Sequence, residues 1–426
     1  MDDRMYLCID LKSFFASVEC AERGLDTMTT RLVVADPSRG RGAICLAVSP
    51  ALKELGVRNR CRIYEIPPGI DYITALPRMK LYMEYAARIY SVYLRYISPE
   101  DIHVYSIDEC FLDITSYRRL YDMNERDLAK MLTDAVYRET GGICATVGIG
   151  TNLFLAKVAL DITAKHAPDR IGYLDEAEFR RTVWYHQPLT DIWNVGRGIA
   201  KRLEKMGIFD LRGVAECEEA KLYREFGVNA EYLIDHAHGR EPCTIADIHA
   251  YVAKSESISN GQILFEDYRF DDALTVLKEM VDPLVLELIE RRKVTDSISL
   301  SVGYSRDMRG SAGTTVKLGG YTNSAKKIRR AFVDCFRKTV NPNYPIRRIN
   351  VGLNDLQDET CATLDLFTDL DAERRELELQ KTVLGLRKKY GKNAILHGIS
   401  LEEKATARER NRLIGGHNSG KEDQES

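Results

Sequence analysis

The sequence lacks the features that mark several common classes of protein. Its formal net charge is only −3 at pH 7, so no excess of one sign indicates a polyanion partner for the whole chain. None of its ten cysteines forms a C-x-x-C pair, which argues against a disulfide framework or a zinc site and for a reducing compartment. No apolar run is long enough for a membrane helix, and the acidic start does not resemble a signal peptide. We therefore expect a soluble, cytoplasmic protein.

The chain is long, and its charge is unevenly distributed. At 426 residues it exceeds what one hydrophobic core accommodates, so we expect about two to four domains. Between residues 310 and 350, nine Lys or Arg residues accompany a single acid, Asp334. Such a segment in a near-neutral chain indicates a local contact with nucleic acid, and a solvated helix face is the alternative. The nine cations are Lys317, Lys326, Lys327, Arg329, Arg330, Arg337, Lys338, Arg347 and Arg348.

Two apolar, β-prone segments, about a hundred residues apart, each end in carboxylates. Asp10 follows the first segment, and the adjacent pair Asp108-Glu109 follows the second. Neighbouring residues of a strand point to opposite faces, so this pair can converge with Asp10 only at a tight turn. Buried carboxylates cost several kcal/mol per ion unless a cation neutralises them, and magnesium prefers such hard oxygen ligands. The three acids therefore predict a site with two Mg²⁺ ions for phosphoryl or nucleotidyl transfer. For Asp108-Glu109 alone, a solvated hairpin turn is the alternative.

The first 167 residues predict a β-α-β-β-α-β order, which is typical of a ferredoxin-like fold. An insertion of about eighty residues separates the first helix from the second strand and must form a lobe of its own. The predicted strands are 5–9, 102–107, 110–114 and 144–149, and the predicted helices are 13–23, 125–140 and 152–165.

Residues 168–240 predict short helices with glycines at their ends. Within them, Gly196 and Gly198 precede Lys201 in a pattern similar to a helix-hairpin-helix. Glycines let backbone amides approach a phosphate, and the N-terminus of the following helix favours the anion. The alternative is an ordinary helix turn. Residues 254–354 then predict a second β-α-β-β-α-β series, with strict alternation at 297–302.

Three ordered motifs carry a resemblance to a known family. They are Asp10-x-x-Ser-Phe14-Phe15-Ala-Ser-Val-Glu19, Tyr105-Ser-Ile-Asp108-Glu109 and Thr146-Val-Gly-Ile-Gly150-x-Asn152-x-x-Leu-Ala156-Lys157. Together they resemble the Y-family translesion DNA polymerases, most closely the UmuC-like bacterial branch, and the likeness covers almost the whole chain. The resemblance implies an α+β multidomain right-hand polymerase. Its parts are a ferredoxin-like palm at 1–28 and 78–167, small fingers at 29–77, a helical thumb at 168–240 with a helix-hairpin-helix near 191–209, a βαββαβ little finger at 250–356 and a C-terminal tail at 357–426.

The resemblance also implies roles for single residues. Asp10 and Asp108 correspond to ligands of both metals, Glu109 to a ligand of the catalytic metal, and the carbonyl of Leu11 to a further ligand. Phe15 stands at the steric gate, where a planar ring excludes a ribose 2′-hydroxyl, whereas Phe14 fits a core position better.

Basic residues are the next group that the resemblance assigns. Lys165 occupies the position of the triphosphate-binding lysine, and Lys157 packs or contacts the primer region. Two positions depart from many relatives: Pro50 replaces a tyrosine and Lys53 an arginine of the fingers helix. Lys53 can still bind phosphate, but without a bidentate fork. Lys12 also stands where many members have an acid or Asn. These departures concern the nucleotide contacts and leave the metal ligands unchanged.

The implied partners are primer-template DNA, deoxynucleoside triphosphates and, through the tail, a sliding clamp. Gly196, Gly198 and Lys201 of the thumb would hold the duplex, together with the little-finger helix that carries Lys326, Lys327, Arg329 and Arg330. Leu364, Leu366 and Phe367 lie in a segment similar to clamp-binding peptides, although it lacks the usual leading Gln, and packing of this segment on its own protein is the alternative. Whether a RecA or UmuD-like factor takes part stays open.

We therefore expect a low-fidelity DNA polymerase that copies damaged template by two-metal nucleotidyl transfer within the SOS response. One alternative is a non-catalytic DNA-binding repair scaffold that has kept the polymerase fold. A weaker alternative is a nucleotide cyclase on a similar palm, which would not need the helix-hairpin-helix or the second basic domain.

Overall fold

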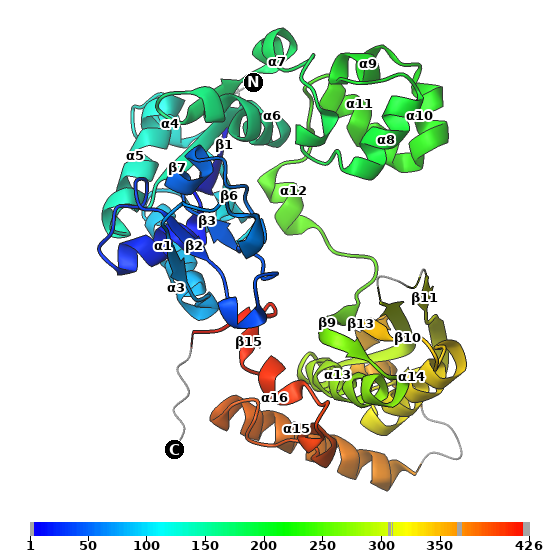
Figure 1. Cartoon of the computed structure of the whole chain (residues 1–426). Coiled ribbons are helices and arrows are strands. Elements are labelled where there is room, and N and C mark those ends of the chain that lie inside the picture. Colours follow the sequence, from blue (N-terminus) through cyan, green and yellow to red (C-terminus); the bar gives the residue numbers. More distant parts are fainter. Residues whose placement is uncertain (1–3, 306–307, 309, 364–368, 421–426) are drawn as a thin grey trace. The chain divides into compact units, whose positions relative to one another are not determined.

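The computed structural model describes residues 4–305, 308, 310–363 and 369–420 (Figure 1). It divides into two compact units, the first comprising residues 1–251 with the chain end from 419, and the second residues 252–418. Within the described ranges, no helix is both long and apolar enough to cross a membrane.

The first unit is built around a sheet with strand order β5-β6-β1-β7-β8. All neighbours are antiparallel except β7 and β8, which are parallel. The order β7-β1-β6-β5 is that of a ferredoxin-like sheet, so the predicted palm fold is confirmed. Strand β8 was not predicted, and it extends the sheet beyond residue 167. The strands are β1 (Tyr6–Leu11), β5 (Ile102–Val104), β6 (Glu109–Asp113), β7 (Ala145–Gly150) and β8 (Ile171–Leu174).

Helices cover both faces of this sheet. Leu7, Ile9 and Leu11 alternate along β1 and point to one face of the sheet, here called the first face, where they join a core shared with several helices. Cys8 and Phe111 face the opposite side, where α6 packs. The helices of the first face are α1 (Phe14–Glu22), α3 (Met79–Tyr93), α4 (Tyr117–Leu120) and α5 (Glu125–Glu139), and α6 comprises Leu153–Val158.

Helix α6 lies unusually close to strand β7 because two glycines leave room for it. A Cβ atom on Gly148 would lie 2.0 Å from the carbonyl oxygen of Ala156, and one on Gly150 would lie 2.1 Å from the Ala156 nitrogen. The chain continues from α6 as a π-helix at Ala159–Thr163 and a 3₁₀ turn at Ala164–His166. The predicted helix at 152–165 is thus present, with one wide turn of the kind that often lies at functional sites.

The lobe inserted after α1 has its own small core, and its sheet has strand order β3-β2-β4. Pro50 is the first residue of α2, where a proline costs nothing because the first amide of a helix has no partner inside the helix. The elements are β2 (Leu32–Val34), β3 (Ala47–Val48), α2 (Pro50–Glu54) and β4 (Ile73–Ala75).

A cluster of short helices follows the palm, as the sequence predicts. Phe179, Leu203 and Leu233 belong to its buried core. The next helix, α12 (Ile245–Ala250), packs on β5 and β6 of the palm sheet. The helices of the cluster are α7 (Glu176–Thr182), α8 (Arg197–Lys205), α9 (Leu211–Glu216), α10 (Glu219–Phe226) and α11 (Ala230–Ala237).

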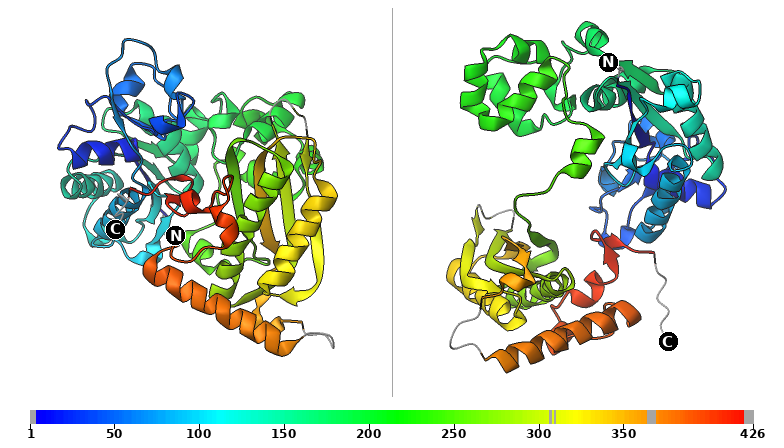
Figure 2. Two further views of the ribbon diagram at one scale, coloured as in Figure 1. Left: turned by 60° about the horizontal axis from the view of Figure 1, so that its bottom comes forward. Right: turned by 180° about the vertical axis from the view of Figure 1, so that it is seen from behind.

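The second unit contains the second β-α-β-β-α-β series. Its central strands lie in the order β12-β10-β13-β9, so the last strand of the series lies between the first and the second. Helices α13 and α14 pack on one face of this sheet (Figure 2). The elements are β9 (Ile258–Tyr268), α13 (Phe270–Glu290), β10 (Lys293–Tyr304), β11 (Ser311–Ala312), β12 (Thr315–Thr322), α14 (Ala325–Thr339), β13 (Ile346–Asn354) and β14 (Gln357–Asp358).

The C-terminal segment folds onto the helical side of the second unit. Glu279, buried on α13, accepts hydrogen bonds from the backbone nitrogens of Thr406 (2.8 Å) and Ala407 (3.2 Å). Lys404 pairs with Glu266 of β9 at 2.5 Å. The elements of this segment are α15 (Leu370–Tyr390), α16 (Ala407–Arg410), β15 (Leu413–Ile414) and β16 (His417–Asn418).

Candidate active site

The register between β1 and β6 brings the predicted acids to one end of the sheet. Asp10 and Glu109 are direct partners in this antiparallel pair, so their side chains leave the same face. The backbone nitrogen of Leu11 donates to the carbonyl oxygen of Asp108 at 2.9 Å, which ties the turn to the end of β1. Acids that are far apart in the sequence are therefore neighbours in the structure.

Asp108 lies in the turn between β5 and β6. The hydroxyl of Ser106 donates to Asp108 Oδ1 at 2.7 Å, and the backbone nitrogens of Tyr105 and Ser106 both donate to the Glu109 carbonyl at 3.0 Å. Strand β5 ends at Val104, earlier than the predicted residue 107, and Glu109 opens β6 instead of lying in the turn. The turn is consequently wider than the sequence suggested, and hydrogen bonds around Asp108 and Glu109 close it.

The electrostatics of Asp10 show that negative charge is concentrated here. The pKa of Asp10 is raised to about 7, chiefly by burial and then by the neighbouring carboxylates of Asp108 and Glu109, while Lys157 opposes the rise. A divalent cation would relieve this repulsion, and the carboxylate oxygens fit the preference of Mg²⁺. The residues present therefore suit the metal, with Asp10, Asp108 and Glu109 as candidate ligands and the carbonyl of Leu11 as a further one.

The acids are not yet arranged around one point. Among the residues that the structure describes, no group of three His, Cys, Asp or Glu side chains forms a ready metal site. Glu109 has other partners: its Oε1 lies 2.8 Å from Lys157 Nζ and accepts a hydrogen bond from Cys8 Sγ at 3.1 Å. Metal binding by Glu109 would require its carboxylate to turn toward Asp10 and Asp108.

Lys157 is therefore a residue of the site. It is buried on α6, where it pairs with Glu109 and, at 3.2 Å, with Asp161. Burial lowers the pKa of Lys157, but the neighbouring Cys8, Glu109 and Asp161 outweigh this effect and raise it above its ordinary value. The sequence offered only packing or primer contact for this lysine. The spacing of Lys157 and Asp161, four residues apart in one helix, was the available signal for one of the two ion pairs.

Three further lysines gather beside the acids. Lys53 Nζ donates to Ser13 Oγ at 2.8 Å, which brings the fingers helix α2 to the start of α1. Lys53 is exposed as a residue, but desolvation of its ammonium by nearby protein atoms lowers its pKa. Lys12 and Lys165 lower it further, and Asp10 acts in the opposite direction. The predicted phosphate-binding lysines, 53 and 165, and the unassigned Lys12 therefore lie within electrostatic range of one another.

Phe15 presents a ring that its neighbours hold in place. It is half-buried and stacked on Tyr82, with ring centroids 4.5 Å apart and planes inclined by 14°. The Tyr82 hydroxyl donates to Glu19 Oε1 at 2.7 Å, and Arg78 Nε donates to the same oxygen at 2.9 Å. Phe14 is buried in the palm core, as the sequence indicated. The motif glutamate, Glu19, thus fixes the residue on which Phe15 stacks.

Two aromatic residues that meet beside the turn, Tyr105 and Trp193, were not assigned a role from the sequence. Tyr105 is 45% exposed, and its hydroxyl accepts a hydrogen bond from Trp193 Nε1 at 3.1 Å. The Lys157 ammonium lies 5.9 Å from the centre of the Tyr105 ring. The hydrogen bond from Trp193 joins the helical cluster to the acidic turn. The only sequence signal for a role of Tyr105 was its place at the start of the motif that ends in Asp108 and Glu109.

The candidate DNA contacts of the thumb lie at the beginning of α8. Gly196 immediately precedes the helix and Gly198 lies in its first turn, and both are exposed. A Cβ atom on either would meet no described atom within 4 Å, so packing does not require glycine here. Lys201 is exposed on the same helix. The helix start is thus open to an anion, as a phosphate contact requires.

The candidate contacts on α14 have acidic partners within the second unit. Lys327 pairs with Glu373 at 2.5 Å, and Arg329 pairs with Asp282. Arg330 lies 3.7 Å from an acid of its own helix, and the backbone nitrogen of Lys326 donates to Glu376. The structure therefore places Lys326, Lys327 and Arg329 near acids of α13 and α15 that the sequence does not show to be near. Leu364, Leu366 and Phe367 of the proposed clamp peptide lie outside the described residues.

Comparison with known proteins gives consistent matches. The impB/mucB/samB family matches residues 9–161, and the impB/mucB/samB family C-terminal domain matches residues 255–366. A Bacillus subtilis (strain 168) protein named for UV-damage repair, UvrX, is 32% identical over 97% of each chain. DNA polymerase IV 2 of the same strain is 30% identical over 98% of this chain and 99% of its own. The solved structure "Y-family DNA polymerase chimera Dbh-Dpo4(243-245)-Dbh" matches with a TM-score of 0.62 over 83% of this chain and 99% of that chain, at 20% identity.

A ferredoxin-like palm with acids at the end of its first strand, joined to a helical cluster and a second αβ domain, defines a right-hand polymerase fold. The matched family regions cover more than half of the chain, and relatives at 30% identity span nearly all of it. The chain therefore belongs to the impB/mucB/samB family, the Y-family DNA polymerases, as its motifs indicated.

Proposed function

We propose that this protein is a translesion DNA polymerase that extends a primer by two-metal nucleotidyl transfer. The observation that carries the proposal is the pairing of Asp10 with Glu109 beside Asp108, together with the raised pKa of Asp10. Several acids placed so that one is neutral near pH 7 indicate a site that holds cations when it works. The name of the relative DNA polymerase IV 2 supports the same activity.

In this proposal the two magnesium ions would be held by Asp10, Asp108, Glu109 and the carbonyl of Leu11. When bound, they supply activation of the primer 3′-hydroxyl and neutralisation of the triphosphate. The protein itself positions the substrates. Lys53 and Lys165, with Lys12 nearby, would hold the triphosphate as point charges.

Phe15 would select the sugar of the incoming nucleotide. Its ring is stacked on Tyr82, whose hydroxyl is fixed by Glu19, so it cannot readily move aside. A ribose 2′-hydroxyl would collide with a ring held in this way. Selection of deoxynucleotides would then follow from the rigidity of the contact.

The protein would bind DNA of any base sequence, because each proposed contact is to a phosphate group. The open start of α8, with Gly196, Gly198 and Lys201, is one contact. On the second unit, ion pairs partly neutralise Lys327, Arg329 and Arg330. We therefore assign further DNA contacts to the face of the sheet that α13 and α14 do not cover. Exposed Arg348 lies there, next to Gly303 of β10.

The tail would bring the enzyme to a sliding clamp through Leu364, Leu366 and Phe367, which raises its effective concentration at the primer. A role in SOS damage tolerance is in keeping with the repair name of the relative UvrX. Removal of the three apolar side chains should abolish clamp-stimulated extension and leave extension without the clamp unchanged. A RecA or UmuD-like factor is tested by its addition to the same reaction.

The experiment that tests the proposal is primer extension with deoxynucleoside triphosphates and Mg²⁺ on intact template and opposite an abasic site. We expect template-directed extension in both cases that stops when the metal is chelated. DNA binding without extension would identify the protein as a repair scaffold, and a cyclic nucleotide product would identify it as a cyclase. Either result would overturn the proposal.

A further inference from the structure

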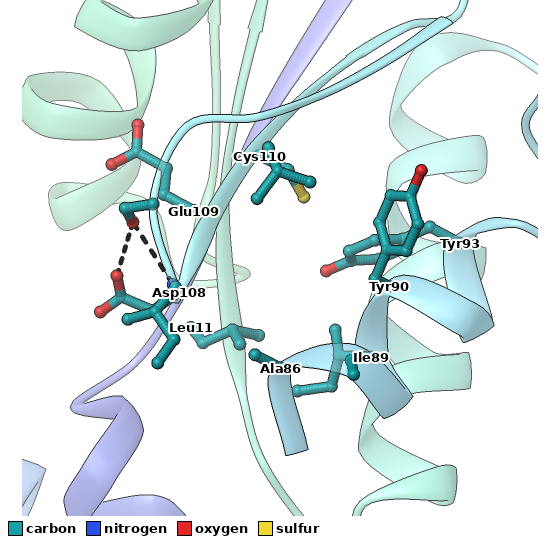
Figure 3. Close-up of a pocket in the computed structure, with 12 residues that line it drawn as sticks. Leu11, Ala86, Ile89, Tyr90, Tyr93, Asp108, Glu109 and Cys110 are labelled. Carbon is teal, nitrogen blue, oxygen red and sulfur yellow. Dashed lines mark hydrogen bonds between the residues drawn. The ribbon is translucent and has the colours of Figure 1, made fainter. Parts of the chain in front are cut away.

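A pocket of about 220 Å³ lies directly behind the acidic turn (Figure 3). One wall is formed by helix α3, with Ala86, Ile89, Tyr90 and Tyr93. The opposite wall is the turn from Val104 to Cys110, which carries Asp108. The pocket thus shares a wall with the proposed catalytic centre.

The pocket is nevertheless on a different side of the sheet from the acids. Leu11 and Cys110, which line it, each follow an acid by one residue and therefore leave the opposite face of the strand. Figure 3 shows the carboxylates of Asp108 and Glu109 directed away from the space beside α3. A molecule in the pocket would contact the back of the turn and leave the carboxylates free.

The lining defines the chemistry of a ligand. Apart from the turn, the walls consist of apolar and aromatic side chains, and Tyr93 adds a hydroxyl to them. The Tyr93 side chain is only 2% exposed, and Figure 3 shows it directed from α3 into the space. Its hydroxyl is not one of the fully buried oxygens that lack a partner among the described residues, so it is open to the space of the pocket. A ligand that displaces water from this hydroxyl must supply a hydrogen bond in its place, because a polar group left unpaired on burial is costly.

The size of the pocket restricts the ligand further. An apolar cavity of about 150 Å³ accommodates benzene, so the larger volume here accommodates one or two fused rings. We propose that this pocket binds a small neutral aromatic molecule of one or two rings that carries one hydrogen-bonding group, and that its binding slows catalysis by bracing the turn that carries Asp108.

The effect on catalysis follows from the position of the turn. Asp108 is held by Ser106, which also lines the pocket, so a molecule wedged between α3 and the turn restrains the same backbone. The lysines that would hold the triphosphate do not line the pocket. The ligand should therefore lower kcat for extension and leave the KM for the nucleotide unchanged. This inhibition rests on the proposed polymerase function, whereas binding itself does not.

The test uses indole as the probe, because its N–H can donate to the Tyr93 hydroxyl, and 1-methylindole as the matched probe without a donor. Calorimetry on the full-length protein should show one indole site with a Kd below about 1 mM, and 1-methylindole should bind several-fold more weakly. In primer extension, saturating indole should lower kcat several-fold. Failure of all extension by the unliganded protein would refute the polymerase proposal without affecting the calorimetric result.

Three variants on α3 complete the experiment. Ala86→Leu fills the pocket and should weaken indole binding at least about tenfold while extension continues. Tyr93→Phe should make indole and 1-methylindole bind alike. Ser91→Ala, at an exposed position of the same helix, is the control and should change neither quantity. Circular dichroism checks that each variant is folded, and Ala86→Val replaces Ala86→Leu if the larger side chain unfolds the protein.

The proposal is overturned if no saturable indole binding is found up to millimolar concentration, or if filling the pocket leaves binding unchanged. It is equally overturned if indole binds but leaves kcat unchanged, or if it competes with the nucleotide.

Discussion

The two β-α-β-β-α-β domains of this chain have the same order of elements but differ in strand order and in the compensation of their charges. In the palm the last strand of the series, β7, lies beside β1, whereas in the second unit it lies between the first and second strands. The palm leaves acids of like charge together at one strand end. In the second unit, cations of α14 pair with acids from α13 and α15.

The two domains therefore differ in whether their charged side chains are neutralised by other residues of the protein. Charges that are compensated within the protein stabilise it modestly and need no ligand. Charges of one sign that are held together against their repulsion favour the binding of a counter-ion. The acidic end of the palm sheet is closer to the second kind, although Lys157 already pairs with Glu109. Helix α14, which is the most basic in the sequence, is closer to the first.

A large loss of stability is expected where α6 packs against β7 of the palm. Gly150→Ala places a methyl group about 2.1 Å from the backbone of α6, so the first unit should lose about 3 kcal/mol or more of stability. The matched change in the second unit is Gly303→Ala, whose Cβ would lie 3.3 Å from that of Arg348, and it should cost far less. Thermal unfolding of both variants measures the difference. Equal losses would contradict the close approach of α6 to β7.

A second comparison separates the two neighbouring phenylalanines of α1. Phe15→Ala should raise the incorporation of ribonucleotides relative to deoxynucleotides by about a hundredfold or more, because the stacked ring is removed. Phe14→Ala should cost about 3–5 kcal/mol of stability, because Phe14 is buried, and should leave sugar selection unchanged. Single-nucleotide incorporation kinetics and thermal unfolding distinguish them. Unchanged selection in Phe15→Ala would remove the steric-gate role.

The sequence allowed the acidic site to be predicted because its parts are local. Each acid ends an apolar segment, and the ferredoxin-like order then brings strands β1 and β6 together. The ion pair of Lys157 with Glu109 could not be predicted, because it depends on how closely α6 approaches the sheet. The pairing of Lys327 with Glu373 likewise depends on where α15 folds, and no local pattern determines that.

The return of helix α12 to the palm and the pairing of β8 with β7 have the same explanation. Ile245 is buried beside Phe111, but nothing in its own segment indicates that partner. Residues 171–174 pair only because β7 is the available edge of the sheet. Elements were thus predictable from local periodicity, whereas contacts between distant elements required the structure.

A smaller effect concerns the charge of the acidic site. The folded pKa of Asp10, about 7, lies above its ordinary value of 3.8, so the protonated form is favoured by folding and stability is lost as pH rises. In chelator, the protein should lose about 1 kcal/mol from this group between pH 6 and pH 8. Asp10→Asn should lack this loss. Denaturant unfolding at the two pH values measures it, and identical pH dependence in the two proteins would show that Asp10 is not buried among like charges.

The smallest expected effect compares cations of the second unit. Arg348→Ala should weaken DNA binding a few-fold and reduce the salt dependence of binding by about one unit, as loss of one phosphate contact does. Arg330→Ala should change the salt dependence less, because Arg330 already lies near Asp334. Fluorescence anisotropy at several salt concentrations measures both. A larger effect of Arg330→Ala on DNA binding would indicate that α14 is the DNA-binding surface of the second unit.

The most direct test of the acidic site is primer extension by Asp108→Ala and Glu109→Ala, with Asp134→Ala, an exposed acid of α5 that pairs with Lys130, as the control. We expect both site variants to lose at least about a thousandfold in kcat, because electrostatic stabilisation of the reacting phosphate is removed, while they bind primer-template DNA as the wild type does. The control should extend normally. Extension at the wild-type rate by either site variant would contradict the two-metal site.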